Sequence, residues 1–268
     1  MPPSEQQIRE FYQEFSLAVG MRDWLRSNPR HQRLKVNMDR LLAGRRGLHL
    51  LDVGCGAGAM TACLRRYGRV WATDFSDAAI SLARELLPDV TFYCGSLEVL
   101  PAGARWDVIT LFDVLEHIPG AHRAQFLGGV HDRLRSGGLL VVSTPYPEFT
   151  RWRRKYEVDT LQMVDEAVDL RPLLAEVEEA GLQLLRYEAY DVWRGSPEYQ
   201  FMVFTTAREP GGPPVLRAAR RYRRLRVLRP PGAQGLRRAV HALRLVRYRS
   251  SWPRIWWLLT GRAPDVKS

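Results

Sequence analysis

The sequence predicts an α/β fold, a doubly wound and mostly parallel sheet followed by a basic helical extension. From Gly47 onward, short apolar runs alternate with segments of helical periodicity, a pattern typical of βαβ units. A glycine-rich turn follows the first apolar run directly. The 268 residues, 46% of them hydrophobic, are enough for one full core and an appendage.

Five apolar runs are expected to form the parallel strands, and helical patterns follow three of them. Gly137-Gly138 is expected to end the third of these helices, where a helix C-terminus favours positive φ. The expected strands are 48–53, 70–74, 90–94, 107–112 and 139–144, and the expected helices are 59–67, 77–87 and 121–136.

The end of the folded core reads as a helix and a hairpin. A helix near 171–180 is expected to close at Gly181, before two β-rich runs, 182–190 and 199–206. Because a short turn joins the two runs, we expect an antiparallel hairpin at the sheet edge. Residues 145–170 make a longer connection than packing requires, so we expect substrate contacts there.

The N-terminal region, 8–43, reads as helical segments that are interrupted at Asn28-Pro29. It is either a lid over a site or a helical cap on one sheet edge. Its aromatic residues are Phe11, Tyr12, Phe15 and Trp24.

The net charge of +11 comes from the end of the chain. Residues 208–268 hold 16 of the 40 basic residues and 2 of the 29 acidic ones, so the preceding residues are slightly acidic overall. Arginines at helical spacing are followed by Trp252, Trp256 and Trp257, a composition that suits an anionic membrane surface. Nucleic acid, or packing of the tail on the domain, would use the same charges.

No basic region followed by an apolar block begins the chain, and its longest apolar runs, such as 255–259, are far shorter than a membrane span. Three scattered cysteines do not form a disulfide framework. We therefore expect a cytoplasmic protein, attached peripherally at the inner membrane face if the tail binds lipid.

The sharpest motif is the run from Leu50 to Ala59, an apolar strand that ends in Gly54-Cys55-Gly56-Ala57-Gly58. Glycines let a ligand approach the backbone closely and expose helix amides to it. The same residues satisfy the dinucleotide fingerprint, and Asp74 sits where a ribose-binding carboxylate would. From this turn alone, a nicotinamide oxidoreductase and a nucleoside-binding transferase both remain open.

The wider pattern resembles class I S-adenosylmethionine-dependent methyltransferases. Asp52 before the turn and Gly58 within it resemble motif I, and the hairpin matches the antiparallel seventh strand of that fold. The resemblance covers about residues 47–206, and it is greatest to the methyltransferase type 11 branch with the ubiquinone-pathway O-methyltransferases. Three further segments resemble the family: Asp74-Phe75-Ser76, Cys94-Gly95-Ser96-Leu97, and Phe112 to Pro119.

This resemblance implies a Rossmann-like seven-stranded sheet with an antiparallel last strand, and three regions. They are an N-terminal helical cap or lid (1–46), an S-adenosylmethionine-binding methyltransferase domain (47–207) and a basic amphipathic extension (208–268). The residues it implies for cofactor binding are Arg33, Asp52, Gly54, Cys55, Gly56, Gly58, Asp74, Phe75, Ser96, Leu97, Phe112 and Asp113.

Methyl transfer to a hydroxyl needs a proton acceptor. His117, with Glu116 beside it, is the candidate base because an imidazole titrates near neutral pH. The alternative is that His117 only shapes the cofactor site. Asp113, Glu116 and His117 also resemble the Glu-x-x-Glu-His of metal-dependent relatives, so Mg²⁺ is an alternative, although our expectation is no metal.

The function expected from these residues and the resemblance is S-adenosylmethionine-dependent O-methylation of a small-molecule or lipid-like acceptor. The extension, through residues 215–260, is expected to contact an anionic membrane. The alternatives are an NAD-dependent oxidoreductase, a methyltransferase acting on RNA, and a non-catalytic module that binds S-adenosylmethionine without turning it over.

Overall fold

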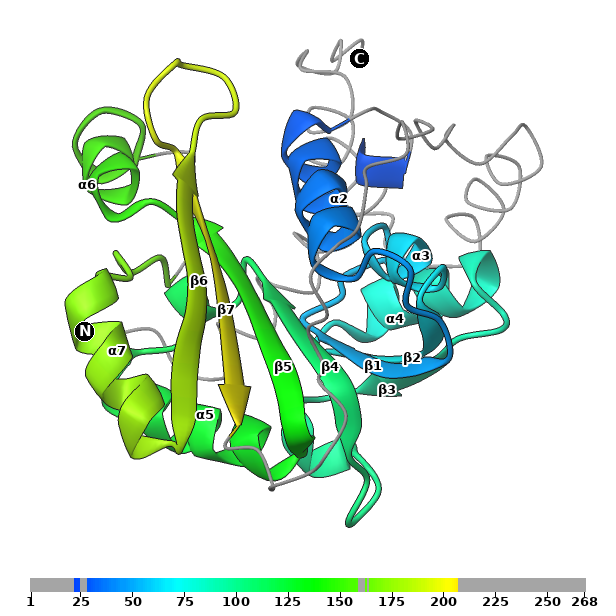
Figure 1. Ribbon diagram of the computed structural model, residues 1–268. Coiled ribbons are helices and arrows are strands. Elements are labelled where there is room, and N and C mark those ends of the chain that lie inside the picture. Colours follow the sequence, from blue (N-terminus) through cyan, green and yellow to red (C-terminus); the bar gives the residue numbers. More distant parts are fainter. Residues whose placement is uncertain (1–21, 25–27, 159–161, 163, 207–268) are drawn as a thin grey trace, which may run out of the picture.

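The computed structural model describes residues 22–24, 28–158, 162 and 164–206, which form a seven-stranded sheet with helices on both faces (Figure 1). The strand order is β3-β2-β1-β4-β5-β7-β6. Strands β1 to β5 pair in parallel, and β7 pairs antiparallel with β5 and β6. The predicted parallel strands and terminal hairpin are confirmed. The strands are β1 (Leu48–Val53), β2 (Gly68–Asp74), β3 (Thr91–Cys94), β4 (Trp106–Phe112), β5 (Leu134–Pro145), β6 (Leu182–Tyr190) and β7 (Tyr199–Thr206).

The strand order reverses between β1 and β4. The chain runs outward from β1 to β3 and then returns to place β4 on the other side of β1. In open α/β sheets, ligands bind outside the carboxyl ends of the strands at such a reversal. The glycine turn follows β1 and the Asp113–His117 segment follows β4, so the fold brings both to this point.

Two apolar clusters lie on the two faces of the sheet, as Figure 1 shows by the helices on each side. One cluster joins the sheet to Leu34, Leu64 and Ile80 of α2 (Pro29–Leu41), α3 (Thr61–Leu64) and α4 (Asp77–Leu86). The other joins it to Leu127 and Leu173 of α5 (Gly120–Asp132) and α7 (Leu170–Glu179). Each of these fully buried side chains contributes about 1.5–3 kcal/mol to stability.

Asn28-Pro29 marks the start of α2. The Asn28 side chain accepts a hydrogen bond from the Arg30 amide, and Pro29 occupies the first helical turn, where no amide is needed. Trp24 lies upstream and donates from Nε1 to the Ala57 carbonyl over 2.7 Å, which ties this segment to the glycine turn. The other aromatics of the predicted cap, Phe11, Tyr12 and Phe15, lie outside the described residues.

Two predicted helices are shorter in the structure. The helix expected over 59–67 is reduced to α3, and three turn residues then lead into β2, which begins at Gly68. A side chain at Gly68 would collide with the Leu48 backbone of the neighbouring strand. The helix expected over 121–136 ends at Asp132, so the prediction that Gly137-Gly138 caps it is wrong. Gly137 does have positive φ, +68°, but it lies in β5 beside the irregularity of the β4–β5 pairing.

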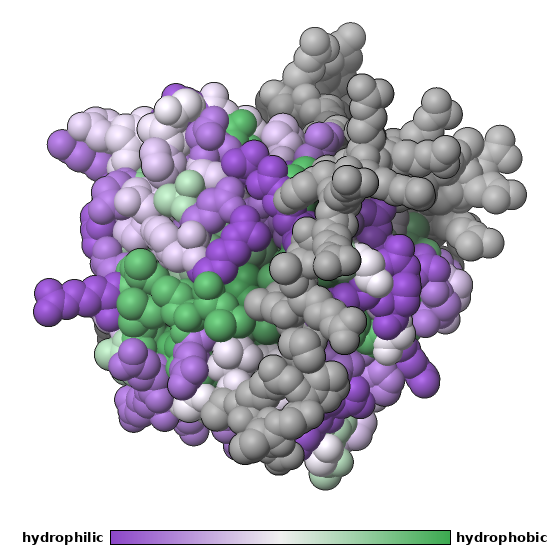
Figure 2. Space-filling model, in the orientation of Figure 1, coloured by the Kyte–Doolittle hydropathy of each residue, from purple (hydrophilic) through white to green (hydrophobic). Residues whose placement is uncertain are grey.

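The long connection after β5 contains a helix, α6 (Pro147–Tyr156), and the edge of the sheet is β6. Figure 2 shows apolar surface where β6 and β7 lie, and Leu184, Leu185 and Tyr187 of β6 are exposed. The β6–β7 pairing shifts register between Leu184 and Arg186, an irregularity that discourages edge-to-edge pairing. No helix in the described part of the chain is long and apolar enough to cross a membrane.

Candidate functional site

The three glycines of the turn after β1 all have positive φ, 71° at Gly54, 52° at Gly56 and 83° at Gly58. A β-carbon at Gly54 would lie 2.5 Å from Cγ2 of Val114, and one at Gly58 would lie 3.0 Å from Cδ1 of Leu87. At Gly56 a β-carbon would meet no atom within 4 Å. Gly54 and Gly58 therefore serve packing, whereas the turn at Gly56 faces open space that a ligand can enter.

Asp74, the last residue of β2, lies beside this turn. Its Oδ2 accepts from the Gly56 amide over 2.7 Å and its Oδ1 from the Ser76 amide over 2.9 Å. Burial raises the pKa of the carboxyl group. Because a carboxylate offers about four lone-pair positions, two such bonds leave capacity for hydroxyl donors from a ligand.

Asp52, at the end of β1, lies behind the turn. It is buried and accepts hydrogen bonds from Thr61 Oγ1 (2.6 Å) and Thr110 Oγ1 (2.7 Å). Burial raises its pKa to about 6. Cys55 donates from Sγ to the Gly56 carbonyl (3.4 Å), and burial raises the pKa of its thiol. These two side chains hold the turn from within the protein.

The loop after β3 is bonded to the end of β2, since the Gly95 amide donates to the Asp74 carbonyl over 2.9 Å. Its Ser96 amide donates to Glu98 Oε1 (3.0 Å), and Leu97, half-buried, begins the short helix η1 (Leu97–Val99). Phe75 is 57% exposed. The fold therefore brings the loop that carries Ser96 and Leu97 to the end of β2, directly before Phe75.

Phe112 ends β4, and Asp113 follows it. Phe112 is buried in the apolar cluster on the α2 side of the sheet. Asp113 has φ +57°, a strained conformation for a residue other than glycine that occurs preferentially at functional sites. Its Oδ2 forms an ion pair with Arg30, and its buried Oδ1 finds no hydrogen-bond partner among the described residues.

Arg30 is the site residue that the sequence analysis missed. It begins α2, its guanidinium lies 5.6 Å from the centre of the Tyr199 ring, and only 14% of its side chain is exposed. Arg33, the predicted residue, turns instead to β6, where it lies 3.5 Å from Glu188 and over the Tyr190 ring. The two arginines lie about one turn apart along α2, and no local signal in the sequence distinguishes them.

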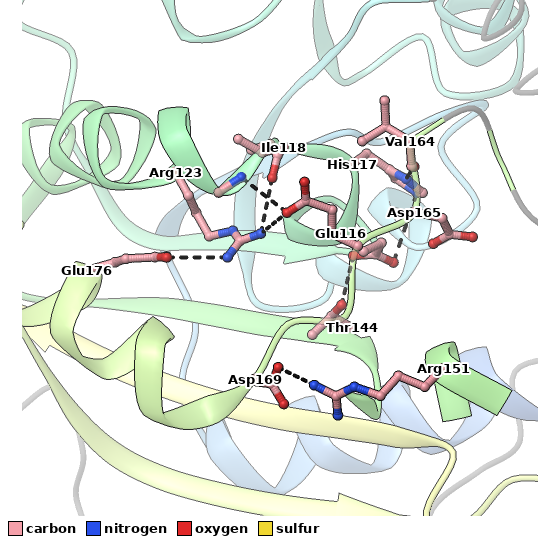
Figure 3. Close-up of polar contacts among 12 residues, drawn as sticks. Glu116, His117, Ile118, Arg123, Thr144, Arg151, Val164, Asp165, Asp169 and Glu176 are labelled. Carbon is pink, nitrogen blue, oxygen red and sulfur yellow. Dashed lines mark hydrogen bonds and ion pairs between the residues drawn. The ribbon is translucent and has the colours of Figure 1, made fainter. Parts of the chain in front are cut away.

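Glu116 and His117 lie in the short helix η2 (Leu115–His117) after β4 (Figure 3). Glu116 is 2% exposed and accepts from Thr144 Oγ1 over 2.8 Å, and burial raises its pKa. His117 Nδ1 lies 2.5 Å from the Val164 carbonyl oxygen, and Nε2 lies 4.0 Å from Glu116 Oε1. Because a carbonyl only accepts, Nδ1 carries the proton, so Nε2 of the neutral ring is the basic nitrogen.

Asp113, Glu116 and His117 do not converge as metal ligands. Within the ranges that the structure describes, no group of three acidic, histidine or cysteine side chains could hold a metal ion. Arg30 occupies Asp113 Oδ2, Thr144 occupies Glu116 Oε2, and the Val164 carbonyl fixes His117 Nδ1. A guanidinium beside the first carboxylate supplies the positive charge that a cation would bring.

Residues 50–138 match a protein family described as a methyltransferase domain. The ubiquinone biosynthesis O-methyltransferase of Coxiella burnetii (strain Dugway 5J108-111) is 31% identical over 159 residues, which are 54% of this chain and 65% of that protein. This chain therefore spans slightly less than two thirds of that relative. The mitochondrial ubiquinone biosynthesis O-methyltransferase of Candida albicans is 33% identical over 115 residues, 39% of this chain and 35% of that protein.

Solved structures share the fold. The magnesium protoporphyrin IX methyltransferase of Synechocystis PCC 6803 with bound SAH has a TM-score of 0.59 at 16% identity, covering 75% of this chain and 98% of its own. The [4+2]-cyclase SpnF has a TM-score of 0.60 at 15% identity, covering 78% and 98%. Because one is named a methyltransferase and the other a cyclase, the shared fold does not by itself assign the reaction.

Proposed function

We propose that the chain is a class I S-adenosylmethionine-dependent methyltransferase and transfers the methyl group of S-adenosylmethionine to a hydroxyl oxygen of a small-molecule acceptor. The match of residues 50–138 to a methyltransferase domain supports this assignment. One observation carries the proposal for these residues. The glycine turn is open at Gly56, with Asp74 on one side and the Arg30–Asp113 pair near the end of the neighbouring strand β4. That arrangement suits a ligand with a ribose at one end and an amino acid at the other.

In this proposal the cofactor lies across the turn from β2 to β4. Asp74 accepts hydrogen bonds from the ribose hydroxyls in addition to those from Gly56 and Ser76. Phe75, Ser96 and Leu97 border the adenine. Gly56 leaves room at the backbone for the chain between ribose and amino acid, and Gly54 and Gly58 let the turn pack closely on Val114 and Leu87. Asp52, Cys55 and Phe112 support the strand ends from behind.

The amino-acid end is assigned to Arg30 and Asp113. An arginine paired with a carboxylate is the charge complement of an ammonium beside a carboxylate. Arg30 would bind the carboxylate of the cofactor and Asp113, through its unpartnered Oδ1, the ammonium. The strained φ of Asp113 is consistent with a residue held for binding. Arg33 is thereby demoted from the role that the sequence suggested.

The cofactor, when bound, would supply a methyl carbon on a positively charged sulfur, and the acceptor oxygen attacks that carbon in line as the neutral thioether leaves. The protein must align the acceptor hydroxyl with that methyl and accept the hydroxyl proton. His117 is the proposed proton acceptor through Nε2, because Nδ1 is committed to Val164. Glu116, 4.0 Å from Nε2, stabilises the imidazolium that results.

The acceptor proposed here is a phenolic or lipid-like hydroxyl compound, by likeness to relatives named ubiquinone biosynthesis O-methyltransferases.

We further propose the three-region organisation, 1–46, 47–207 and 208–268, in which the last region contacts an anionic membrane surface. Vesicles of anionic lipid and an RNA of matched charge, titrated at increasing salt, test this. Replacing Trp256 and Trp257 by serine should weaken vesicle binding more than RNA binding if lipid is the partner.

The proposal is tested first by calorimetric titration of the full chain with S-adenosylmethionine, S-adenosylhomocysteine and NADH. Binding of the first two without the third supports the assignment and justifies a methylation screen with phenols and polyprenyl phenols. Binding of NADH alone would replace it with an oxidoreductase. Cofactor binding with no methyl transfer to any acceptor class would favour a binding module.

A further inference from the structure

A short strap of chain, residues 164–169, runs beside η2 and touches it with backbone atoms (Figure 3). The Glu166 amide donates to the Glu116 carbonyl over 2.7 Å. Two residues earlier, the Val164 carbonyl accepts the His117 Nδ1 proton at 2.5 Å. The strap therefore meets both residues of the Glu116-His117 pair, and the position of its backbone decides which nitrogen of His117 carries the proton.

Helix α5 holds the strap from one side through Arg123. This guanidinium is almost fully buried and contacts Glu166 Oε2 at 3.0 Å, the Ile118 carbonyl at 3.2 Å and Glu176 Oε1 at 3.3 Å. The Gly120 amide donates to the same Glu166 oxygen over 3.1 Å. Glu166 is thus bound to the first turn of α5 and, through Arg123, to α7.

Helix α6 holds the strap from the other side through three arginines. Arg151 forms an ion pair with Asp169, Arg154 donates to the Asp165 carbonyl, and Arg153 Nη1 lies 3.8 Å from Asp165 Oδ2. Val168, near the end of the strap, is fully buried and its carbonyl accepts from Gln200 Nε2 over 2.7 Å. Each acidic side chain of the strap, at positions 165, 166 and 169, therefore has an arginine partner.

Val168 belongs to the apolar cluster beneath α5 and α7, so its burial also holds this segment on the protein. Arg123 and Asp165 are buried, and a buried charge must meet its partner, so their ion pairs fix geometry more than they add net stability. The pair between Arg151 and Asp169 is about half exposed and therefore weaker. The four arginines therefore restrict the strap to one position, in which its two backbone bonds reach Glu116 and His117.

We propose that residues 164–169 are a positioning element for His117, with Arg123 and Glu166 as its positioning residues. The strap holds His117 in the Nδ1–H tautomer and so keeps Nε2 as the proton acceptor. This inference rests on the function proposed for His117. It assigns a role to residues that contact neither the glycine turn nor the end of β2.

The test is a nitrogen NMR measurement of the imidazole tautomers in the full chain with ¹⁵N-labelled histidine. Spectra are taken at about pH 8, above the ordinary imidazole pKa of ~6.5. The chain has six histidines, and the signal of His117 is identified as the one that is missing from the spectrum of His117→Gln. The wild-type protein is expected to show His117 as Nδ1–H, whereas a histidine in water is mainly Nε2–H.

Two variants perturb the strap. Arg123→Met removes the buried guanidinium, and Glu166→Ala removes a side chain that is 39% exposed, so the second variant is expected to fold even if the first does not. Each should move the His117 tautomer ratio toward Nε2–H by roughly two- to tenfold, the effect of weakening one hydrogen bond. The control is Arg135→Met, which removes an arginine bound to Asp107 at the opposite ends of the strands.

S-adenosylhomocysteine binding is measured on the same samples. No binding to the wild-type protein would refute the proposed function whatever the tautomer. Intact binding together with an Nε2–H His117 in the wild-type protein, or with an unchanged tautomer in both folded variants, would overturn the role of the strap alone. A shift in Arg135→Met as large as in the strap variants would also overturn it.

Discussion

Gly56 and Asp74 are joined by a hydrogen bond of 2.7 Å from the Gly56 amide to Asp74 Oδ2. It connects the turn after β1 to the end of β2, so the residue proposed to bind the ribose also fixes the turn on which the cofactor lies. Asp74→Ala should therefore weaken S-adenosylhomocysteine binding by roughly 10- to 100-fold, the usual loss for hydrogen bonds to a charged group. Calorimetry measures this, with Asp89→Ala, an exposed residue beside Arg65, as the control. Equal affinities would place the nucleoside elsewhere.

Two glycines of the turn should respond differently to alanine. Gly56→Ala meets open space, and its φ of 52° is accessible to alanine at a cost of about 1 kcal/mol, so the protein should fold but lose cofactor affinity. Gly54→Ala places a methyl group against Val114, so its main effect should be on stability. Thermal unfolding and calorimetry on both variants check this contrast. The assignment fails if Gly56→Ala binds S-adenosylhomocysteine normally.

Asp52 should make stability depend on pH. Burial raises its pKa in the folded protein to about 6, while the unfolded value is near 4, so the folded protein binds the proton more tightly. The stabilisation is present below about pH 4 and is lost as the pH rises through about 6, a change of about 3 kcal/mol. Asp52→Asn removes this term. The free energy of unfolding of Asp52→Asn minus that of the wild-type protein, measured with urea, should rise from pH 4 to pH 7. A difference that stays constant with pH would contradict the raised pKa of Asp52.

Arg30 and Arg33 lie three residues apart on α2 but face different partners. Arg30→Met should weaken S-adenosylhomocysteine binding by about tenfold or more, because a charged hydrogen bond to the carboxylate is lost and Asp113 is left without its partner. Arg33→Met should have little effect, since its side chain is 40% exposed and pairs with Glu188. Calorimetry on the two variants decides between them, and the reverse order would restore the residue suggested by the sequence.

His117→Asn should lower turnover by roughly 10²- to 10⁴-fold, the usual contribution of a general base, with cofactor affinity largely unchanged. Single-turnover methylation of an acceptor identified by the phenol screen gives the rate, and calorimetry gives the affinity. Asp89→Asn, a change at an exposed residue beside Arg65, serves as the control for turnover. Loss of cofactor binding alone would make His117 a wall of the cofactor site.

The sequence by itself determined the parallel strands, the terminal hairpin and the turn from Gly54 to Gly58. These features depend on local patterns: apolar runs of strand length, and glycines where φ must be positive. It also placed Asp74, Ser96 and His117 at strand ends, which meet at one edge of a parallel sheet. Helix ends were less well predicted, because α3 and α5 end where β2 and β5 begin to pair, and pairing partners lie far away in the sequence.

Only the tertiary structure decided which side chains meet. Arg30 rather than Arg33 reaches Asp113, because the start of α2 at Asn28 sets the direction of each residue on that helix relative to β4. The contact of Val164 with His117 joins positions 47 residues apart, and Arg123 of α5 binds both Glu166 of the same strap and Glu176 of α7. Hydrogen bonds and ion pairs of this kind depend on the relative placement of whole elements, which follows from burial of the two apolar clusters rather than from any local motif.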